Sequence, residues 1–187
     1  MISDLYIRLG FDHILDPNGY DHILFVVALC SIYNWKEWKK VVILVTAFTI
    51  GHSLTLALSS LRIVNISSAL IETLIPITIL ITCLYNILKV YKGFKNEKVN
   101  INYILALFFG LIHGLGFSNF LKPMFNKDES IIGPLLSFNI GVELGQLVIV
   151  LGVLLLSLLW SNVLKIQLKY LTYLLSGIIF IWTLTLL

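Results

Sequence analysis

Four histidines and three carboxylates are the residues of this sequence whose chemistry stands out most from the apolar segments around them. They are His13, Asp21, His22, His52, Glu72, His113 and Glu143. Neutral imidazoles together with carboxylates suit Zn²⁺, Ni²⁺, Fe²⁺ or Mn²⁺. The two cysteines, Cys30 and Cys83, do not join this set, which disfavours a soft copper site. The residue types therefore predict a site for a divalent transition metal, although the motif His-Glu-x-x-His of soluble zinc enzymes is absent from the sequence.

The composition places these residues in a membrane protein. The chain has 187 residues, of which 58% are hydrophobic and only 12% are charged, and its mean hydropathy is +0.95. An ordinary soluble domain has about 25% charged residues, and a soluble protein of this size could not cover its surface with so few charges. The composition argues against a soluble enzyme, a disordered chain and a nucleic-acid-binding protein.

Long apolar runs separated by short charged loops predict an all-α, polytopic membrane protein with one integral membrane domain over residues 1–187. Six transmembrane helices are predicted at about 17–34, 41–61, 67–90, 101–121, 131–160 and 170–187. We expect residues 1–15 to include a short helix that lies at the membrane interface. Asp16 and Pro17 have the residue types of an N-cap and a first helical residue, and they predict the start of the first span.

Lysines in the loops predict the orientation of the chain. The loops after the first, third and fifth spans contain Lys36, Lys39, Lys40, Lys89, Lys92, Lys95, Lys98, Lys165 and Lys169. The opposite side has only Arg8, Arg62, Lys122 and Lys127. The positive-inside rule places the lysine-rich side in the cytoplasm. We therefore predict a multi-pass protein of the bacterial inner membrane with both termini in the periplasm.

The histidines and acids of the spans all fall at similar depth under this orientation. His52 and His113 each lie about nine residues from the outer end of their spans, and Glu143 lies about twelve residues from the outer end of its span. Because a helix rises about 1.5 Å per residue, these side chains fall in the outer half of the bilayer or near its middle. Asp21 and His22 lie in the first turns of the first span, and His13 lies at the same outer interface. Ionisable residues within spans are candidates for function, and a common depth predicts one shared site in the outer half of the bilayer. The inner half offers little polarity beyond Asn86 and the two cysteines.

Other polar residues recur at helical spacing beside the candidate ligands. We expect four of them to hydrogen-bond to the ligands and to orient them: Thr49, Ser53, Asn139 and Gln146. Small residues next to His113, namely Gly110 and Gly114, would let a neighbouring helix approach closely.

Four stretches of the chain resemble the HupE/UreJ membrane proteins, which are associated with hydrogenase and urease accessory functions. They are Gly19-Tyr-Asp21-His22-Ile-Leu-Phe25, Thr46-Ala-Phe-Thr49-Ile-Gly51-His52-Ser53-Leu-Thr55-Leu, Phe109-Gly110-Leu-Ile-His113-Gly114-Leu-Gly116-Phe117 and Phe138-Asn139-Ile-Gly141-Val-Glu143-Leu-Gly145-Gln146. The resemblance implies a nickel or cobalt permease. By the same resemblance, its functional residues would be Asp21, His22, His52, His113 and Glu143.

Three functions are compatible with these residues. A permease would capture a divalent ion (nickel, cobalt or zinc) outside and release it inside; we favour this function because of the resemblance. A metal-dependent intramembrane hydrolase or transferase would instead activate a water molecule. Glu143 or Glu72 would then act as general base on a lipid, an acyl chain or a membrane peptide, and the one-sided polar layer favours this alternative. A non-catalytic accessory protein with structural histidines is the third. The oligomeric state is open.

Overall fold

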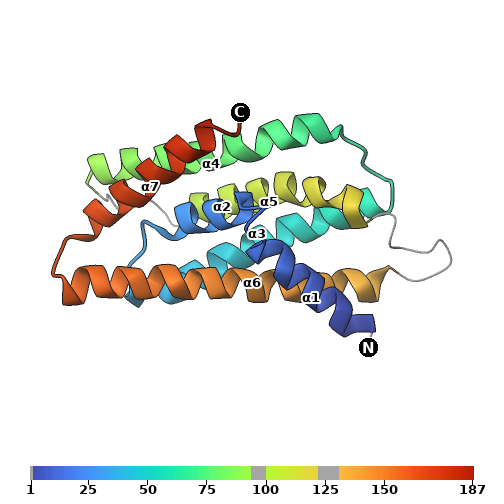
Figure 1. The fold of residues 1–187 in the computed structure, drawn as a ribbon, viewed down its shortest axis with the longest axis horizontal. Coiled ribbons are helices and arrows are strands. Elements are labelled where there is room, and N and C mark those ends of the chain that lie inside the picture. Colours follow the sequence, from blue (N-terminus) through green and yellow to red (C-terminus); the bar gives the residue numbers. More distant parts are fainter. Residues whose placement is uncertain (1, 94–99, 122–130) are drawn as a thin grey trace.

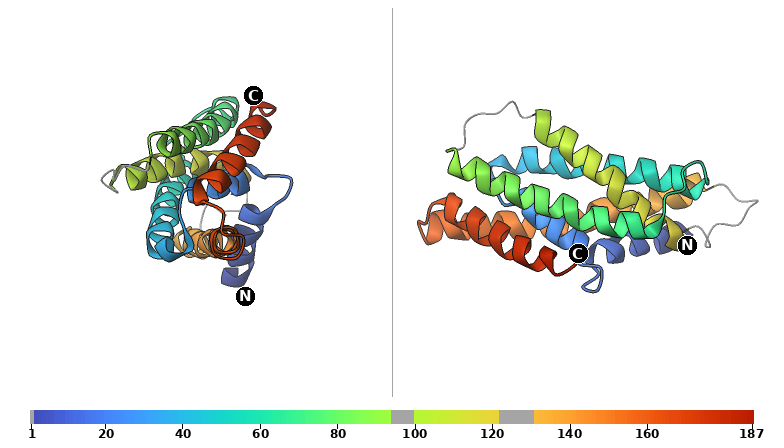
Figure 2. Two further views of the ribbon diagram at one scale, coloured as in Figure 1. Left: turned by 90° about the vertical axis from the view of Figure 1, so that its left-hand side faces the viewer. Right: turned by 90° about the horizontal axis from the view of Figure 1, so that it is seen from above.

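The structure is a computed structural model that describes residues 2–93, 100–121 and 131–187, and in these ranges it is all-α, as predicted (Figure 1). Its helices are α1 (Ile2–Leu15), α2 (Asp21–Cys30), η1 (Trp35–Glu37), α3 (Trp38–Ser60), α4 (Ser68–Tyr91), α5 (Asn100–Leu121), α6 (Ile132–Leu158), η3 (Leu159–Val163) and α7 (Leu168–Leu184). All α-helices run roughly along the longest axis of the molecule (Figures 1 and 2).

Among the described residues, three helical segments are long and apolar enough to cross a membrane, which points to a membrane protein. They are Trp35–Ser60, Ser68–Tyr91 and Ile132–Val163. Three further apolar helices within the described residues are shorter: Asp21–Cys30, Asn102–Phe117 and Leu168–Leu184. Helix length and hydropathy therefore support the long spans directly but do not by themselves establish six. Large aliphatic side chains such as Ile43, Ile50 and Leu54 are exposed on the outer faces, where lipid would cover them.

One end of the bundle gathers most of the lysines, and we call it the lysine-rich end. It contains the start of α3 with Lys39 and Lys40, the end of α4 with Lys89, and the connection from α6 to α7 (Figure 1, left). Lys95 and Lys98, which also count toward the predicted orientation, lie outside the described residues. Lys39, Lys40 and Lys89 thus lie in the end turns of helices and not in loops as predicted, but they lie at the same end of the bundle.

The chain around Asp16 and Pro17 forms a turn, so the predicted helix start at these residues is wrong. The Asp16 side chain accepts a hydrogen bond from the backbone N–H of Asn18 at 2.8 Å, and the Gly19 N–H donates to the Asp16 carbonyl at 3.2 Å. Asp, Pro and Gly at the first, second and fourth positions are typical of a type I turn. Helix α2 begins only at Asp21, and its ten residues extend about 15 Å, half the thickness of the hydrocarbon core.

The predicted N-terminal helix is present as α1, which packs tightly along α6, while its position at the membrane interface stays a prediction. A Cβ atom on Gly10 would lie 2.0 Å from the Phe138 carbonyl oxygen, and one on Gly141 would lie 2.0 Å from that of Ile7. The two helices run in the same direction, since later residues of α1 meet later residues of α6: Ile14 approaches Gly145. Helices α1 and α2 follow one another along the long axis, with α2 nearer the lysine-rich end (Figure 1).

Helices α3 and α5 form a second close pair through glycines. A Cβ atom on Gly51 would lie 2.1 Å from the Leu107 carbonyl oxygen, and one on Gly110 would lie 2.1 Å from that of Phe48. Such distances are possible only without side chains at the crossing, as is common where membrane helices pack closely. This contact sets His52 of α3 beside the helix that carries His113.

Candidate metal site

The four histidines, which come from four different helices, converge in the interior of the bundle. The ring centroid of His22 in α2 lies 4.5 Å from that of His13 in α1, 5.8 Å from that of His52 in α3 and 5.2 Å from that of His113 in α5. His22, His52 and His113 are at most 3% exposed, and His13 is half-buried. We call these four residues, together with Asp21, the histidine cluster.

The cluster contains two sets of three ligand atoms, each compact enough to surround one metal ion. The first set is His13, His22 and His52, and the second is Asp21, His22 and His113. Within each set the ligand atoms lie within 4.8 Å of one another. We call the first set the outer trio and the second set the inner trio, because the second contains His113, which contacts the aromatic core. His22 belongs to both trios.

Several ring nitrogens of the cluster are buried without a hydrogen-bond partner among the described residues. They are Nε2 of His13, Nε2 of His22, both nitrogens of His52 and Nδ1 of His113. A buried polar atom without a partner costs about 1–3 kcal/mol, and each such group in a native protein needs a reason. A bound metal ion would supply the missing partner for several of these atoms at once.

Two neighbouring side chains fix the tautomers that leave these nitrogens available. Asp21 Oδ1 lies 3.1 Å from His22 Nδ1, and because a carboxylate only accepts, the proton of His22 sits on Nδ1. The Thr78 hydroxyl donates to the Ile75 carbonyl at 2.7 Å, so toward His113 Nε2, at 3.0 Å, it accepts. In both histidines the nitrogen without a hydrogen-bond partner is therefore unprotonated, and its free lone pair can bind a metal.

Thr78 was not among the residues predicted for the site, and its role gives a testable expectation. Replacing Thr78 with valine keeps the shape but removes the acceptor for His113, so metal affinity should fall by roughly 10–100-fold. The measurement is the Kd for Ni²⁺ or Zn²⁺ of the purified protein by isothermal titration calorimetry. Thr78→Ser should restore the affinity, whereas Thr73→Val, at an exposed position of the same helix, should leave it unchanged. Equal affinity in wild type and Thr78→Val would contradict the role.

Glu143 and Glu72 lie apart from the two trios. Glu143 is half-buried on α6, and its carboxylate accepts a hydrogen bond from the Thr46 hydroxyl of α3. Glu72 is exposed on α4. Of the four residues expected to orient ligands, Thr49 donates to Gln146 Oε1 at 2.8 Å and Ser53 donates to the Thr49 carbonyl at 2.6 Å. Gln146 Nε2 and Asn139 Oδ1 are buried without a partner in the described part of the chain.

Aromatic rings enclose the cluster and keep its surroundings apolar. The His13 ring lies 3.8 Å from that of Phe117, which stacks on Phe138 at 5.1 Å. The rings of Phe25 and Phe48 lie 5.0 and 5.2 Å from that of His113. Electrostatic interactions are stronger in such an apolar environment than in water, which strengthens the attraction between a bound cation and the Asp21 carboxylate.

An open cleft of about 580 Å³ lies beside His13, on the side of α1. Its lining combines apolar residues with Asp12 and Asp16. The cleft gives the histidine cluster an opening that carries carboxylates, as suits the approach of a cation.

Comparison with known proteins identifies the family. The profile described as HupE / UreJ protein matches residues 2–186, essentially the whole chain. Searches of curated proteins and of solved structures found no match. The match includes all four stretches in which the sequence resembles this family, and it covers every residue of the histidine cluster. The chain therefore belongs to the HupE/UreJ family of proteins.

Proposed function

We propose that this membrane protein is a permease for a divalent transition metal, nickel or cobalt, which the histidine cluster binds on its way across the bilayer. The observation that carries the proposal is the set of five unpaired imidazole nitrogens buried where four helices meet. A structural role would pair these atoms with protein groups, because burial without a partner is unfavourable. Membership of the HupE/UreJ family supports a role in metal handling.

The proposal includes six crossings of a bacterial inner membrane with the lysine-rich end in the cytoplasm. Helices α1 and α2 would together make the first crossing, interrupted at the turn around Pro17. Discontinuous membrane helices commonly form the binding sites of transporters. His13 and His22 flank the interruption, and both histidines belong to the outer trio.

The residues of the chain would then act in sequence. Asp12 and Asp16 attract the cation into the cleft, and the outer trio replaces part of its hydration shell. His22 passes the ion to the inner trio, because this residue belongs to both trios and has a single unpaired nitrogen. Asp21 and Thr78 hold the two inner imidazoles in the binding tautomer, and the aromatic rings exclude water.

Uptake by proteoliposomes tests this function. Vesicles with the wild-type protein should accumulate radioactive Ni²⁺ or Co²⁺, and His113→Ala should reduce uptake to the level of empty vesicles, because the inner trio loses a ligand. Ser157→Ala, which removes a buried hydroxyl of α6 outside the cluster, is the matched control and should transport normally. Unchanged uptake by His113→Ala would overturn the proposal.

Elemental analysis of the purified protein separates this function from the metal-dependent enzyme. A permease should hold an exchangeable ion that dialysis against a chelator removes, whereas an enzyme should retain stoichiometric metal. The one-sided polarity that favoured an enzyme is less marked than predicted, since the lysine-rich end contains buried polar groups besides Asn86, such as Thr172, whose hydroxyl donates to the Ser31 carbonyl at 2.8 Å. There the Asn86 amide donates to the Ala28 carbonyl at 2.7 Å and to Ser31 at 3.2 Å.

A further inference from the structure

Three helices around the histidine cluster repeat the same order of side chains, one helical turn apart. The order is histidine, phenylalanine, leucine: His22, Phe25 and Leu29 in α2; His52, Phe48 and Leu44 in α3; His113, Phe109 and Leu105 in α5. Residues three or four apart lie on one face of a helix. The helices therefore stack a layer of phenylalanines between the histidines and a layer of leucines.

The phenylalanine layer (Phe25, Phe48 and Phe109) is continuous and buried. The ring of Phe25 lies 4.9 Å from that of Phe48 and 5.9 Å from that of Phe109. All three side chains are buried. Two of them contact the ring of His113 directly, so the layer begins where the histidine cluster ends.

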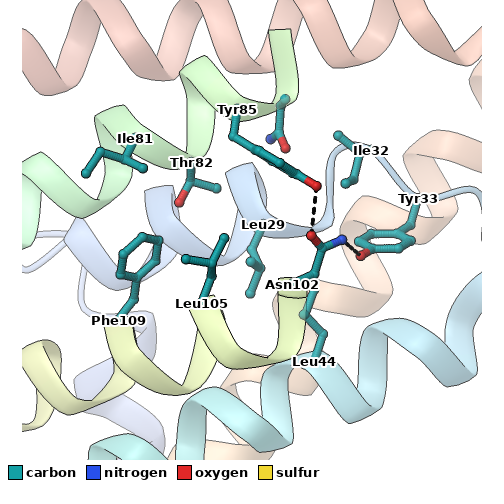
Figure 3. A pocket seen from close by; sticks show the side chains of 11 residues that line it. Leu29, Ile32, Tyr33, Leu44, Ile81, Thr82, Tyr85, Asn102, Leu105 and Phe109 are labelled. Carbon is teal, nitrogen blue, oxygen red and sulfur yellow. Dashed lines mark hydrogen bonds between the residues drawn. The ribbon is translucent and has the colours of Figure 1, made fainter. Parts of the chain in front are cut away.

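A pocket lies on the other side of this layer, toward the lysine-rich end. Figure 3 shows the side chains that line it. Phe109 forms part of its wall, together with the three residues of the leucine layer, Leu29, Leu44 and Leu105. The cavity of about 30 Å³ can hold a water molecule, which needs about 10–15 Å³ by the same measure. A space for water thus lies one phenylalanine layer away from the buried imidazoles.

Polar groups connect this pocket to the lysine-rich end. The Tyr85 hydroxyl donates to Asn102 Oδ1 at 2.8 Å, and the Asn102 amide donates to the Tyr33 hydroxyl at 3.0 Å (Figure 3). Lys89 Nζ donates to the Tyr85 hydroxyl at 3.2 Å. Thr82 adds a further hydroxyl to the lining. Hydroxyl and amide oxygens bind a transition metal more weakly than imidazole does, as suits a place that an ion must leave.

We propose that the phenylalanine layer is the barrier of the transport route and that the pocket beyond it is the exit vestibule from which the cation reaches the lysine-rich end. The inference rests on the proposed function and adds the part of the route that the histidine cluster does not provide. A narrow apolar layer blocks ions because water leaves it. The ion passes when the rings of Phe25 and Phe109 move apart and water from the pocket reaches His113.

A matched pair of cysteine variants tests the barrier without measuring transport. Thr78 contacts His113 on one side of the layer, and Thr82, one turn further along α4, lines the pocket on the other. Each is replaced by cysteine in a protein whose two native cysteines are alanine (C30A/C83A). Right-side-out and inverted membrane vesicles are treated with a membrane-impermeant methanethiosulfonate reagent, and the rate of modification is measured by mass spectrometry.

Thr82→Cys should react from one side of the membrane, which defines the side of the pocket, and Thr78→Cys should be unreactive from that side. Adding Phe25→Ala and Phe109→Ala should make Thr78→Cys react from the pocket side at least about tenfold faster, which corresponds to a barrier lower by about 1.4 kcal/mol. Phe180→Ala in α7, which also packs against the core, should not do so. If the double alanine variant does not fold, Phe109→Leu alone should give a smaller increase.

Two results would overturn the inference. One is an unreactive Thr82→Cys, and the other is a Thr78→Cys that reacts equally with and without the phenylalanine substitutions. Neither result bears on metal uptake by the wild-type protein, so the proposed function would survive them. Conversely, wild-type vesicles without uptake combined with the expected thiol reactivities would refute the permease and leave the barrier in place.

Discussion

Replacing His22 with alanine should weaken the binding of Ni²⁺ or Zn²⁺ by about 1,000-fold or more, well beyond the loss expected for a residue that only orients a ligand. The reason is that His22 is the one residue common to the outer and inner trios, so its loss leaves each with two ligand atoms. Its hydrogen bond to Asp21 is lost as well. Calorimetric titration of the purified protein with each metal measures the effect.

His13→Ala is the matched comparison for this variant, because it removes a ligand of the outer trio alone. The inner trio of Asp21, His22 and His113 keeps all its atoms, so binding should weaken much less than in His22→Ala. Circular dichroism establishes that both variants keep their helical content. Wild-type affinity in His22→Ala would show that the cluster does not bind the metal, and equal losses in both variants would refute the division into two trios.

Gly110→Val should destabilise the fold more than any other single change considered for this protein. A Cβ atom at this position would lie 2.1 Å from the Phe48 carbonyl oxygen, and backbone cannot move aside as a side chain can. The helices α3 and α5 must separate, at a free-energy cost of about 3 kcal/mol or more. For a chain of this length, that corresponds to a melting temperature lower by about 6–12 °C. A thermal shift assay in detergent measures it.

Gly152→Val provides the control, since it places the same residue in a helix where nothing lies within 4 Å of the new Cβ atom. Its melting temperature should stay within the error of wild type. The separation of α3 from α5 also moves His52 away from His113, so Gly110→Val should lose metal affinity even in the fraction that remains folded. An unchanged melting temperature in Gly110→Val would contradict the close crossing.

The depth argument predicted much of the candidate site because sequence position along a span gives the height of a residue in the bilayer. His13, Asp21, His22, His52 and His113 share one height, and the structure brings them together. Height does not say toward which neighbour a side chain points. From Thr46 to His52 the helix turns by about 600°, which is about 120° short of two full rotations, so Thr46 meets Glu143 of α6 while His52 lies beside α2.

The long helices α3, α4 and α6 could be predicted from apolar length, whereas the start of α2 was placed four residues too early, at Pro17 instead of Asp21. Asp16 and Pro17 fit a helix start as well as a turn, and the composition of the two residues alone does not separate these. Gly19 at the fourth position was the signal for the turn, because a type I turn favours glycine there. Thr78 had no signal of its own, since a threonine in an apolar helix most often bonds to its own backbone.

The sharing of His22 has a consequence for occupancy. His22 Nε2 is the one unpaired nitrogen of this ring, since Nδ1 is held by Asp21. A single lone pair cannot serve two ions, so filling the outer trio empties the inner one. Each chain would thus carry a single ion at any moment, distributed between two neighbouring positions. Saturation of the protein would follow a simple hyperbola with a stoichiometry of one, whichever of the two positions the ion prefers.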